Sequence, residues 1–239
     1  MKIKRVNTTN DRELTPPYAR YLVPLIRPFE NFDLFFVRSL RRRAVRRLRL
    51  QPGDRVLDVG CGPGGSFPYL VDAVTQSGVV VGVEISPKMA VNARRRIAKN
   101  GWMNVDIIVA DAKEVELQGS FDGLLLLGAP DIYACPAALA NLDPYLKDDA
   151  HVVAFGAKLS RHPLGRMFNS IVRLMFSKAT FTSTPALDYE PWKVLESGIG
   201  ALKVDELFFG WMFLAWGQRT TKRASDAQPR DKSATTRDS

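Results

Sequence analysis

A glycine-rich turn and three carboxylates are the residues of this sequence whose types and spacing could do chemistry. Residues 56–65 read VLDVGCGPGG, and Gly60, Gly62 and Gly65 match the G-x-G-x-x-G pattern of a nucleotide-binding turn. This pattern alone admits two kinds of cofactor, a dinucleotide and an adenosyl cofactor that carries an amino acid. The turn contains no lysine of the P-loop type, so it does not predict a phosphate cradle.

The carboxylates favour the amino-acid cofactor. Asp58 lies two residues before the first glycine, where a dehydrogenase strand is normally apolar and where a carboxylate can hold an ammonium group, directly or through water. Glu84 ends the next apolar strand and can accept both hydroxyl groups of a ribose, as either cofactor requires. Asp111 ends the third strand and can accept the adenine amino group, while the Ala112 amide donates to the ring.

Alternating strands and helices must position these residues. We expect strands at residues 56–59, 79–83, 105–110, 121–127 and 151–156, and helices at residues 67–75, 87–100 and 137–146. Ser86 is placed to cap the second helix and Gly101 to end it. Residues 204–218 fit two tightly joined strands. The pattern predicts an α/β fold with a doubly wound parallel sheet, whose carboxyl edge binds the ligand.

Two basic amphipathic segments flank the predicted sheet. Seven arginines lie between residues 38 and 49, and one helical face of residues 29–50 carries Phe29, Phe32, Phe36, Leu40, Ala44 and Leu48. Residues 161–178 combine apolar and basic side chains in the same way. The net charge of +9 is therefore local, and it predicts an acidic partner, which could be nucleic acid, an anionic lipid or an anionic small molecule; the apolar faces of these segments favour an anionic membrane. The alternative is that both apolar faces pack on the domain while the arginines face water.

The strand-end motifs resemble a known family. VLDVGCGPGG, VVGVEISPKM, VADA and FDGLLLLGAP follow one another in the order and spacing of the class I S-adenosyl-methionine-dependent methyltransferases, over residues 55–156. The resemblance implies a Rossmann-like, seven-stranded, mostly parallel sheet with an antiparallel last strand, N-terminal helices and a helical insertion after strand five. It implies S-adenosyl-methionine as the cofactor.

The predicted cofactor site comprises Asp58, Gly60, Gly62, Glu84, Ile85, Met89, Asp111, Ala112, Leu127, Gly128 and Tyr18. According to the resemblance, Asp58, Gly60 and Gly62 line the methionine part. Glu84 binds the ribose, and Ile85 and Met89 flank the adenine. Asp111 and Ala112 contact the adenine edge, and Leu127 and Gly128 contact the cofactor's amino group through the backbone. Tyr18 lies in a segment that folds over the cofactor in many small-molecule methyltransferases, and we expect it to contact cofactor or substrate.

The substrate is predicted less directly. We expect methyl transfer to a hydrophobic small molecule or lipid, such as a phospholipid amine, at a membrane surface, because the pattern is similar to bacterial phospholipid N-methyltransferases and quinone methyltransferases. The alternatives are an RNA or protein methyltransferase anchored by the arginine-rich helix, and a non-catalytic cofactor-binding scaffold. The catalytic residues are unknown, because methyl transfer needs mainly alignment and a dry site. Two cysteines and two histidines fit no zinc pattern, so no metal is expected.

The chain is expected to have three parts. Residues 1–52 form an N-terminal helical lid, residues 53–218 the methyltransferase domain with a helical insertion at 160–180, and residues 219–239 a disordered tail. The N-terminus is no signal peptide, and no apolar run reaches the ~20 residues that span a bilayer. We therefore expect a cytoplasmic protein that contacts the inner membrane face. Nucleic acid is the less favoured partner, since residues 128–133 read GAPDIY, unlike an amino-methylating nucleic-acid enzyme.

Overall fold

The computed structural model describes residues 35–170 and 190–220. Four parts of the sequence-based prediction lie outside these described residues. They are Tyr18, the rest of the expected N-terminal segment up to residue 34, residues 171–180 of the expected insertion and residues 221–239 of the expected tail.

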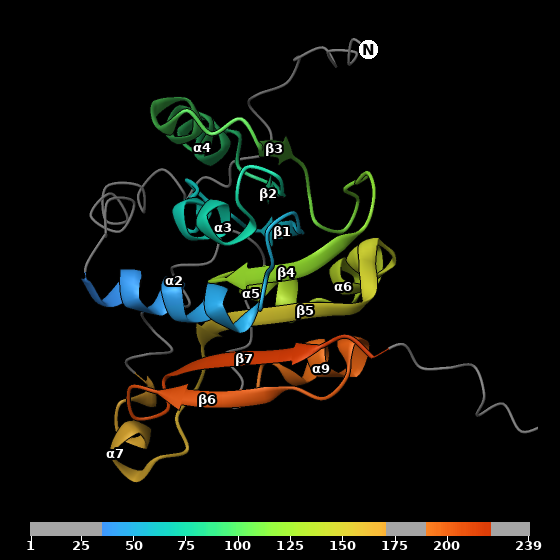
Figure 1. Ribbon diagram of the computed structural model, residues 1–239. Helices are drawn as coiled ribbons and strands as arrows, with labels where there is room; N and C mark the ends of the chain where they lie inside the picture. Colours follow the sequence, from blue (N-terminus) through green and yellow to red (C-terminus); the bar gives the residue numbers. More distant parts are fainter. Residues whose placement is uncertain (1–34, 171–189, 221–239) are drawn as a thin grey trace, which may run out of the picture.

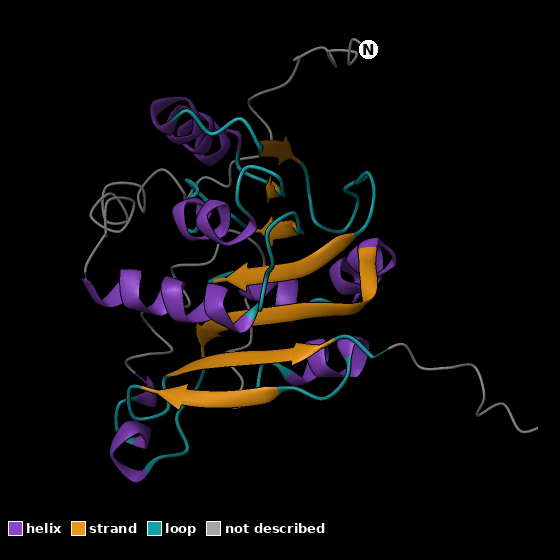
Figure 2. Cartoon of the chain, viewed as in Figure 1, coloured by secondary structure: helices purple, strands orange, loops and turns teal. Residues whose placement is uncertain are grey.

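A seven-stranded sheet with the order β3-β2-β1-β4-β5-β7-β6 forms the centre of the molecule (Figures 1 and 2). Its strands are β1 (Arg55–Val59), β2 (Val79–Glu84), β3 (Val105–Val109), β4 (Phe121–Leu127), β5 (Leu146–Ala157), β6 (Lys203–Leu207) and β7 (Met212–Gln218). The first five run parallel, whereas β7 pairs antiparallel with both β5 and β6. The predicted Rossmann-like, mostly parallel sheet is confirmed, and the reversed strand is β7, which follows all the others in the described chain.

Helices cover both faces of the sheet. The helical elements are α2 (Phe35–Arg47), α3 (Phe67–Val74), α4 (Pro87–Asn100), α5 (Pro130–Tyr133), α6 (Pro136–Leu142), the 3-10 turn η1 (Asp143–Tyr145), α7 (Pro163–Arg166) and α9 (Lys193–Ile199). Buried residues of α2, α3 and α4 share one apolar cluster with one face of the strands. Buried residues of α6 and α9 share the other cluster. The result is the three-layer arrangement seen in Figure 1.

Local capping fixes the helix that follows β2. The backbone N–H of Met89 donates to the Ser86 hydroxyl at 3.4 Å, and Gly101 ends the helix in the left-handed region with φ of 67°. Both caps were predicted from the sequence. The helix predicted at residues 137–146 is shorter, because η1 contains Pro144 and β5 already begins at Leu146.

The apolar face of α2 packs on the sheet. Leu40, Ala44 and Leu48 are at most 8% exposed, and Ala44 and Leu48 belong to the cluster that contains β1 and α3. The predicted amphipathic pattern is therefore present, and in the described residues its apolar side is the buried one. The arginines of α2 occupy the remaining surface, where several of them contact other elements of the fold.

The carboxyl-terminal end of the described chain is anchored. The Arg219 guanidinium donates to both oxygens of Asp143, at 2.7 and 2.9 Å, and to Asp148 at 3.0 Å. Such a two-pronged pair is stronger than a single contact. Arg219 and Thr220, which were predicted to belong to the tail, thus extend the fold by two hydrogen-bonded residues beyond β7, since their N–H groups donate to the carbonyls of Ala150 at 2.8 Å and Ile199 at 3.0 Å.

Candidate cofactor site at the carboxyl edge of the sheet

The predicted cofactor residues gather where four parallel strands end. The strands β3, β2, β1 and β4 lie side by side in that order, so their carboxyl ends share one edge of the sheet. The glycine turn follows β1, which lies between β2 and β4, so the strand order reverses at this point. Ligands of open α/β sheets bind at such a reversal of strand order. The ten described residues of the predicted site all lie at or just beyond this edge.

The turn after β1 requires its glycines. Gly60, Gly62 and Gly64 have φ of 73°, 55° and 76°, a region that favours glycine. A Cβ on Gly60 would lie 2.8 Å from the Cβ of Ala129, so a larger residue would collide. A Cβ on Gly62, by contrast, would meet nothing within 4 Å. The backbone of Gly62 therefore borders open space that a ligand can occupy.

Glu84 braces the turn as well as facing the site. One carboxylate oxygen accepts from the Gly62 N–H at 2.8 Å, and the other accepts from the Ser86 N–H at 2.8 Å. Burial raises the pKa of Glu84, and the two backbone hydrogen bonds oppose that shift. A carboxylate oxygen has two lone pairs, so both oxygens retain an acceptor site for ribose hydroxyls. The bracing contact joins residues 22 apart and was not predicted from the sequence.

Asp58 is a buried carboxylate with an unsatisfied oxygen. The residue is 1% exposed, and Oδ2 has no hydrogen-bond partner among the described residues. Burial raises the pKa of Asp58 to about 7; Arg41 acts to lower it and Glu84 to raise it. An orphaned acceptor of this kind is costly without a donor. A cationic group such as the ammonium of an amino acid supplies that donor.

Asp111 and Ala112 partly serve the local chain. Asp111 is half-buried and accepts from the Lys113 N–H at 2.9 Å, with the Lys113 ammonium at 3.9 Å. The Ala112 carbonyl accepts from the Asn141 side chain at 3.1 Å. Asp111 therefore closes a turn after β3, and one of its oxygens is already engaged in that turn.

The remaining predicted residues frame the open side. Ile85 is 41% exposed at the end of β2, and Met89 is half-buried on α4. Gly128 has φ of 68°, and a Cβ there would meet nothing within 4 Å. Its N–H donates to the Phe155 carbonyl at 2.8 Å. The cofactor's ammonium is itself a hydrogen-bond donor, so at this strand end it could bind only to backbone carbonyl oxygens and not to the Gly128 N–H.

Arg41 is a site neighbour that the sequence did not single out. A Cβ on Gly65 would lie 2.5 Å from both Cζ and Nη2 of Arg41, so the guanidinium rests against the glycine turn. The sequence offers Arg41 as one of seven arginines between residues 38 and 49. Nothing in its spacing distinguishes it, because only the packing of α2 on α3 directs this side chain to the turn.

The arrangement fits S-adenosyl-methionine. Such a cofactor carries an ammonium, a ribose and an adenine. It also carries a methyl group on a positively charged sulfur, and an acceptor atom can bond to this methyl group as the sulfur leaves. Asp58 supplies a carboxylate oxygen without a hydrogen-bond partner among the described residues, and Glu84 supplies two oxygens that can accept from ribose hydroxyls. Gly62 and Gly128 leave space beside the backbone for the cofactor, because neither has a side chain. Among the described residues no cluster of three His, Cys, Asp or Glu side chains could hold a metal ion.

Exposed apolar side chains lie further along the same edge. We call this surface the apolar edge; it consists of Leu164, Met167, Phe168, Phe208 and Phe209. Ala157, the last residue of β5, pairs with Met212, so the turn between β6 and β7 stands at the carboxyl edge beside α7. The Trp211 indole N–H donates to the Gly165 carbonyl at 3.2 Å, which ties the two segments together.

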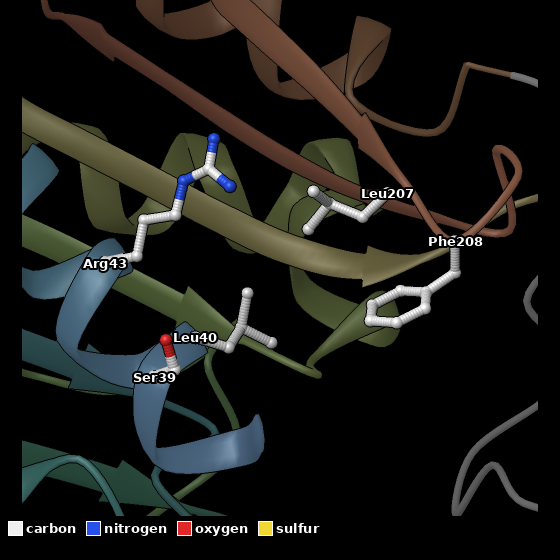
Figure 3. A pocket seen from close by; sticks show the side chains of 5 residues that line it. All are labelled: Ser39, Leu40, Arg43, Leu207 and Phe208. Atoms are coloured by element: carbon white, nitrogen blue, oxygen red, sulfur yellow. The ribbon is translucent and has the colours of Figure 1, made fainter. Parts of the chain in front are cut away.

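A shallow pocket borders the apolar edge (Figure 3). Leu207 at the end of β6 and Phe208 in the following turn extend toward α2, which contributes Ser39, Leu40 and Arg43. None of the predicted cofactor residues lines it. The pocket marks the place where α2 meets the last two strands.

Comparisons with known proteins agree with this geometry. Residues 56–149 match the family model described as a methyltransferase domain. The chain is 29% identical over 136 residues to aklanonic acid methyltransferase DauC of Streptomyces sp. strain C5, covering 56% of this chain and 61% of that protein. It is 28% identical over 160 residues to demethylmenaquinone methyltransferase of Symbiobacterium thermophilum, covering 66% of this chain and 60% of that protein.

A solved structure shares the fold. The crystal structure of a SAM-dependent methyltransferase from Aquifex aeolicus superimposes with a TM-score of 0.56 at 18% identity, covering 75% of this chain and 89% of that one. The chain spans only about three fifths of the two curated relatives' lengths. Residues 56–149 form a methyltransferase domain, and the whole sheet has the fold of the S-adenosyl-methionine-dependent methyltransferase from Aquifex aeolicus. No helix in the described ranges is long and apolar enough to cross a membrane.

Proposed function

We propose that this protein transfers the methyl group of S-adenosyl-methionine to a hydrophobic small molecule or lipid that reaches the site across the apolar edge. The observation that carries this proposal is the shared edge of the sheet. The orphaned Asp58 carboxylate and the braced glycine turn lie at its β1 end, and exposed aromatic side chains lie at its β5–β7 end.

The apolar edge supports an apolar acceptor. Phe208 and Phe209 are 45% and 61% exposed, although burying such side chains is normally favourable. The underlying turn is rigid, because the buried Ser160 hydroxyl donates to the Phe209 carbonyl and accepts from the His162 N–H at 3.0 Å. A preorganised apolar surface on the same sheet edge as a methyl donor suits a hydrophobic acceptor, which would also help to exclude water.

A membrane-held lipid is the finer form of this proposal. The α2 face that was expected to enter a membrane is buried at Leu40, Ala44 and Leu48. Contact with a membrane would instead have to use the apolar edge, beside which Arg166 is exposed. An anionic bilayer offers both an apolar layer for the phenylalanines and phosphates for the arginine.

The alternatives have weaker support. An RNA or protein methyltransferase anchored by α2 would need its arginines for the partner. Arg43 and Arg47 instead pair with Asp205 at 2.6 and 3.6 Å, and Arg47 also lies 3.9 Å from the centre of the Trp216 ring. A non-catalytic scaffold would bind the cofactor and transfer nothing.

The test is an assay with a labelled methyl donor. The full-length protein is incubated with the donor and a total lipid extract, and separately with total RNA and with a protein extract, and each labelled product is identified. Labelling of an apolar extractable compound is expected. Labelling confined to RNA or protein would overturn the acceptor class, and cofactor binding without any labelled product would favour the scaffold.

Two variants make the assay specific. Glu84→Ala should weaken S-adenosyl-methionine binding about tenfold or more in calorimetry, because it removes both the ribose acceptor and the brace on Gly62. Glu116→Ala changes an exposed residue that is outside the predicted cofactor set, so it is the control and should bind normally. Flotation with anionic and with neutral vesicles then separates a membrane-held lipid from a free small molecule.

A further inference from the structure

We infer that Arg41 of α2 recognises the carboxylate of the cofactor's amino acid, so that Asp58 and Arg41 together hold the two opposite charges of that group. The inference rests on the proposed use of S-adenosyl-methionine. It adds a residue from outside the strand-end motifs, and it gives the arginine-rich helix a part in cofactor selection.

The position of Arg41 is the first support. Its guanidinium lies so close to Gly65 that a Cβ on this glycine would come within 2.5 Å of Cζ and Nη2 and 3.0 Å of Nε. Gly65 is therefore bare on the side where the arginine lies. The side chain is half-buried, unlike those of Arg42 and Arg46 on the same helix, which are exposed.

The charge balance is the second support. An amino acid presents an ammonium and a carboxylate on one carbon, so a site that holds both needs an anion and a cation close together. Asp58 supplies a buried acceptor with an oxygen unsatisfied among the described residues. Arg41 is near enough to that carboxyl to lower its pKa. A guanidinium presents a planar fork of donors that matches a carboxylate.

The anchoring of α2 is the third support. Arg43, two residues further along, donates to Asp205 of β6 at 2.6 Å, and Ala44 and Leu48 are buried in the sheet's core. Arg42 lies 6.0 Å from the centre of the Tyr69 ring on α3. The residues directly after Arg41 thus hold the helix against β6, α3 and the core, which keeps the guanidinium at the turn before any ligand arrives.

The experiment pairs one protein change with one ligand change. Isothermal titration calorimetry measures the affinities of S-adenosyl-methionine and of its decarboxylated analogue, which keeps the ammonium and the sulfonium but lacks the carboxylate. The wild-type chain should prefer the carboxylated ligand by about tenfold or more. In Arg41→Met this preference should fall to within about threefold, because affinity for the carboxylated ligand falls much more than affinity for the analogue.

Controls separate recognition from structure. Arg46→Met changes an exposed arginine of the same helix and should keep the full preference. Gly65→Ala leaves the charge in place but displaces the guanidinium, and it should lower the preference without loss of the fold, which thermal unfolding checks. Arg41→Lys should retain part of the preference.

Each outcome decides between specific statements. Equal weakening of both ligands in Arg41→Met would mean that Arg41 only supports the turn, and would overturn the inference. An unchanged preference would overturn it too. If the wild-type chain binds neither ligand, the proposed function fails instead, and NAD is then the cofactor to titrate.

Discussion

The Lys158 ammonium, on a side chain with no exposed surface, lies 2.5 Å from a carboxylate oxygen of Glu206. Lys158 directly follows β5 and Glu206 belongs to β6, on the other side of β7, so the pair ties the end of β5 to the strand that leads into the apolar edge. The ammonium also lies 5.6 Å from the centre of the Trp192 ring. The Glu206 side chain is itself 45% exposed, so the ammonium is the buried end of the pair, and it depends on these partners for the interactions that water would otherwise supply.

Removing the partner of Lys158 should destabilise the protein. Glu206→Ala leaves a buried ammonium without its carboxylate, and we expect a loss of about 2–3 kcal/mol in the free energy of unfolding. Lys158→Met in the same chain should recover most of that loss, since the uncompensated charge is gone. Urea unfolding of the two single variants and the double variant measures the coupling; additive effects would contradict the burial argument.

The unliganded protein should become more stable when Asp58 is made neutral. The pKa of this carboxyl rises from an ordinary value of 3.8 to about 7 in the fold, so between these pH values the native state holds a proton that the unfolded state has lost. Stability therefore falls as pH rises from about 4 to about 7. Asp58→Asn should remove this fall and add roughly 3–4 kcal/mol at about pH 8. Melting curves at about pH 4, 6 and 8 test it, and equal gains at all three would contradict it.

The same carboxyl should make cofactor binding depend on pH. Ammonium binding requires the ionised form of Asp58, whose pKa is about 7 in the empty site. Affinity should therefore fall up to about tenfold per unit below about pH 7, with release of about one proton on binding at about pH 6. Calorimetry in two buffers with different ionisation heats counts that proton. In Asp58→Asn the affinity should be weak and constant with pH; a slope that persists would assign the proton elsewhere.

The turn of the apolar edge should serve contact rather than stability. Phe208 and Phe209 have φ of 52° and 53°, where a non-glycine residue costs about 1–2 kcal/mol. Phe209→Asn should leave stability unchanged or raise it by up to about 1 kcal/mol, and lower kcat/KM for an apolar acceptor. Met103→Asn alters a 95% exposed apolar residue near the start of β3, at the opposite side of the sheet, and should not change activity. A Phe209→Asn variant with unchanged kcat/KM would remove the apolar edge from the acceptor's path.

The contact between α2 and the last strands should contribute measurably to stability. Arg47 stacks on Trp216 at 3.9 Å and lies 3.6 Å from Asp205. Arg47→Ala should cost about 1 kcal/mol, mainly through the lost stacking, because a half-exposed ion pair contributes little. Arg46→Ala, one residue earlier and exposed, should cost close to nothing in the same urea titration. Equal losses would point to helix propensity instead.

Locally encoded features could be predicted from the sequence. The strand ends, the glycine turn and the caps at Ser86 and Gly101 each depend on a few neighbouring residues, and the structure has them where expected. The ten described cofactor residues meet because parallel strands bring their carboxyl ends to one edge, a consequence of the fold class. Residues within a few short motifs therefore reveal both the fold and the cofactor.

Contacts between distant residues were not predictable in the same way. Glu84 accepts a hydrogen bond from a turn 22 residues away, and Lys158 pairs with Glu206 across 48 residues. No periodicity distinguishes Arg41 from its six neighbours, and α9 forms from residues whose pattern was not assigned. The sequence also left open which side of α2 faces the protein, because an amphipathic helix can bury its apolar side in a core or in a bilayer.

The position of α2 has a consequence for linkage between ligands. One end of its contact surface touches the glycine turn through Arg41, and the other reaches β6 and β7 through Arg43 and Arg47. A displacement of α2 at one end therefore moves its other end as well. If methyl donor binding tightens that element, it strengthens acceptor binding by some factor, and thermodynamic reciprocity requires the acceptor to strengthen donor binding by the same factor.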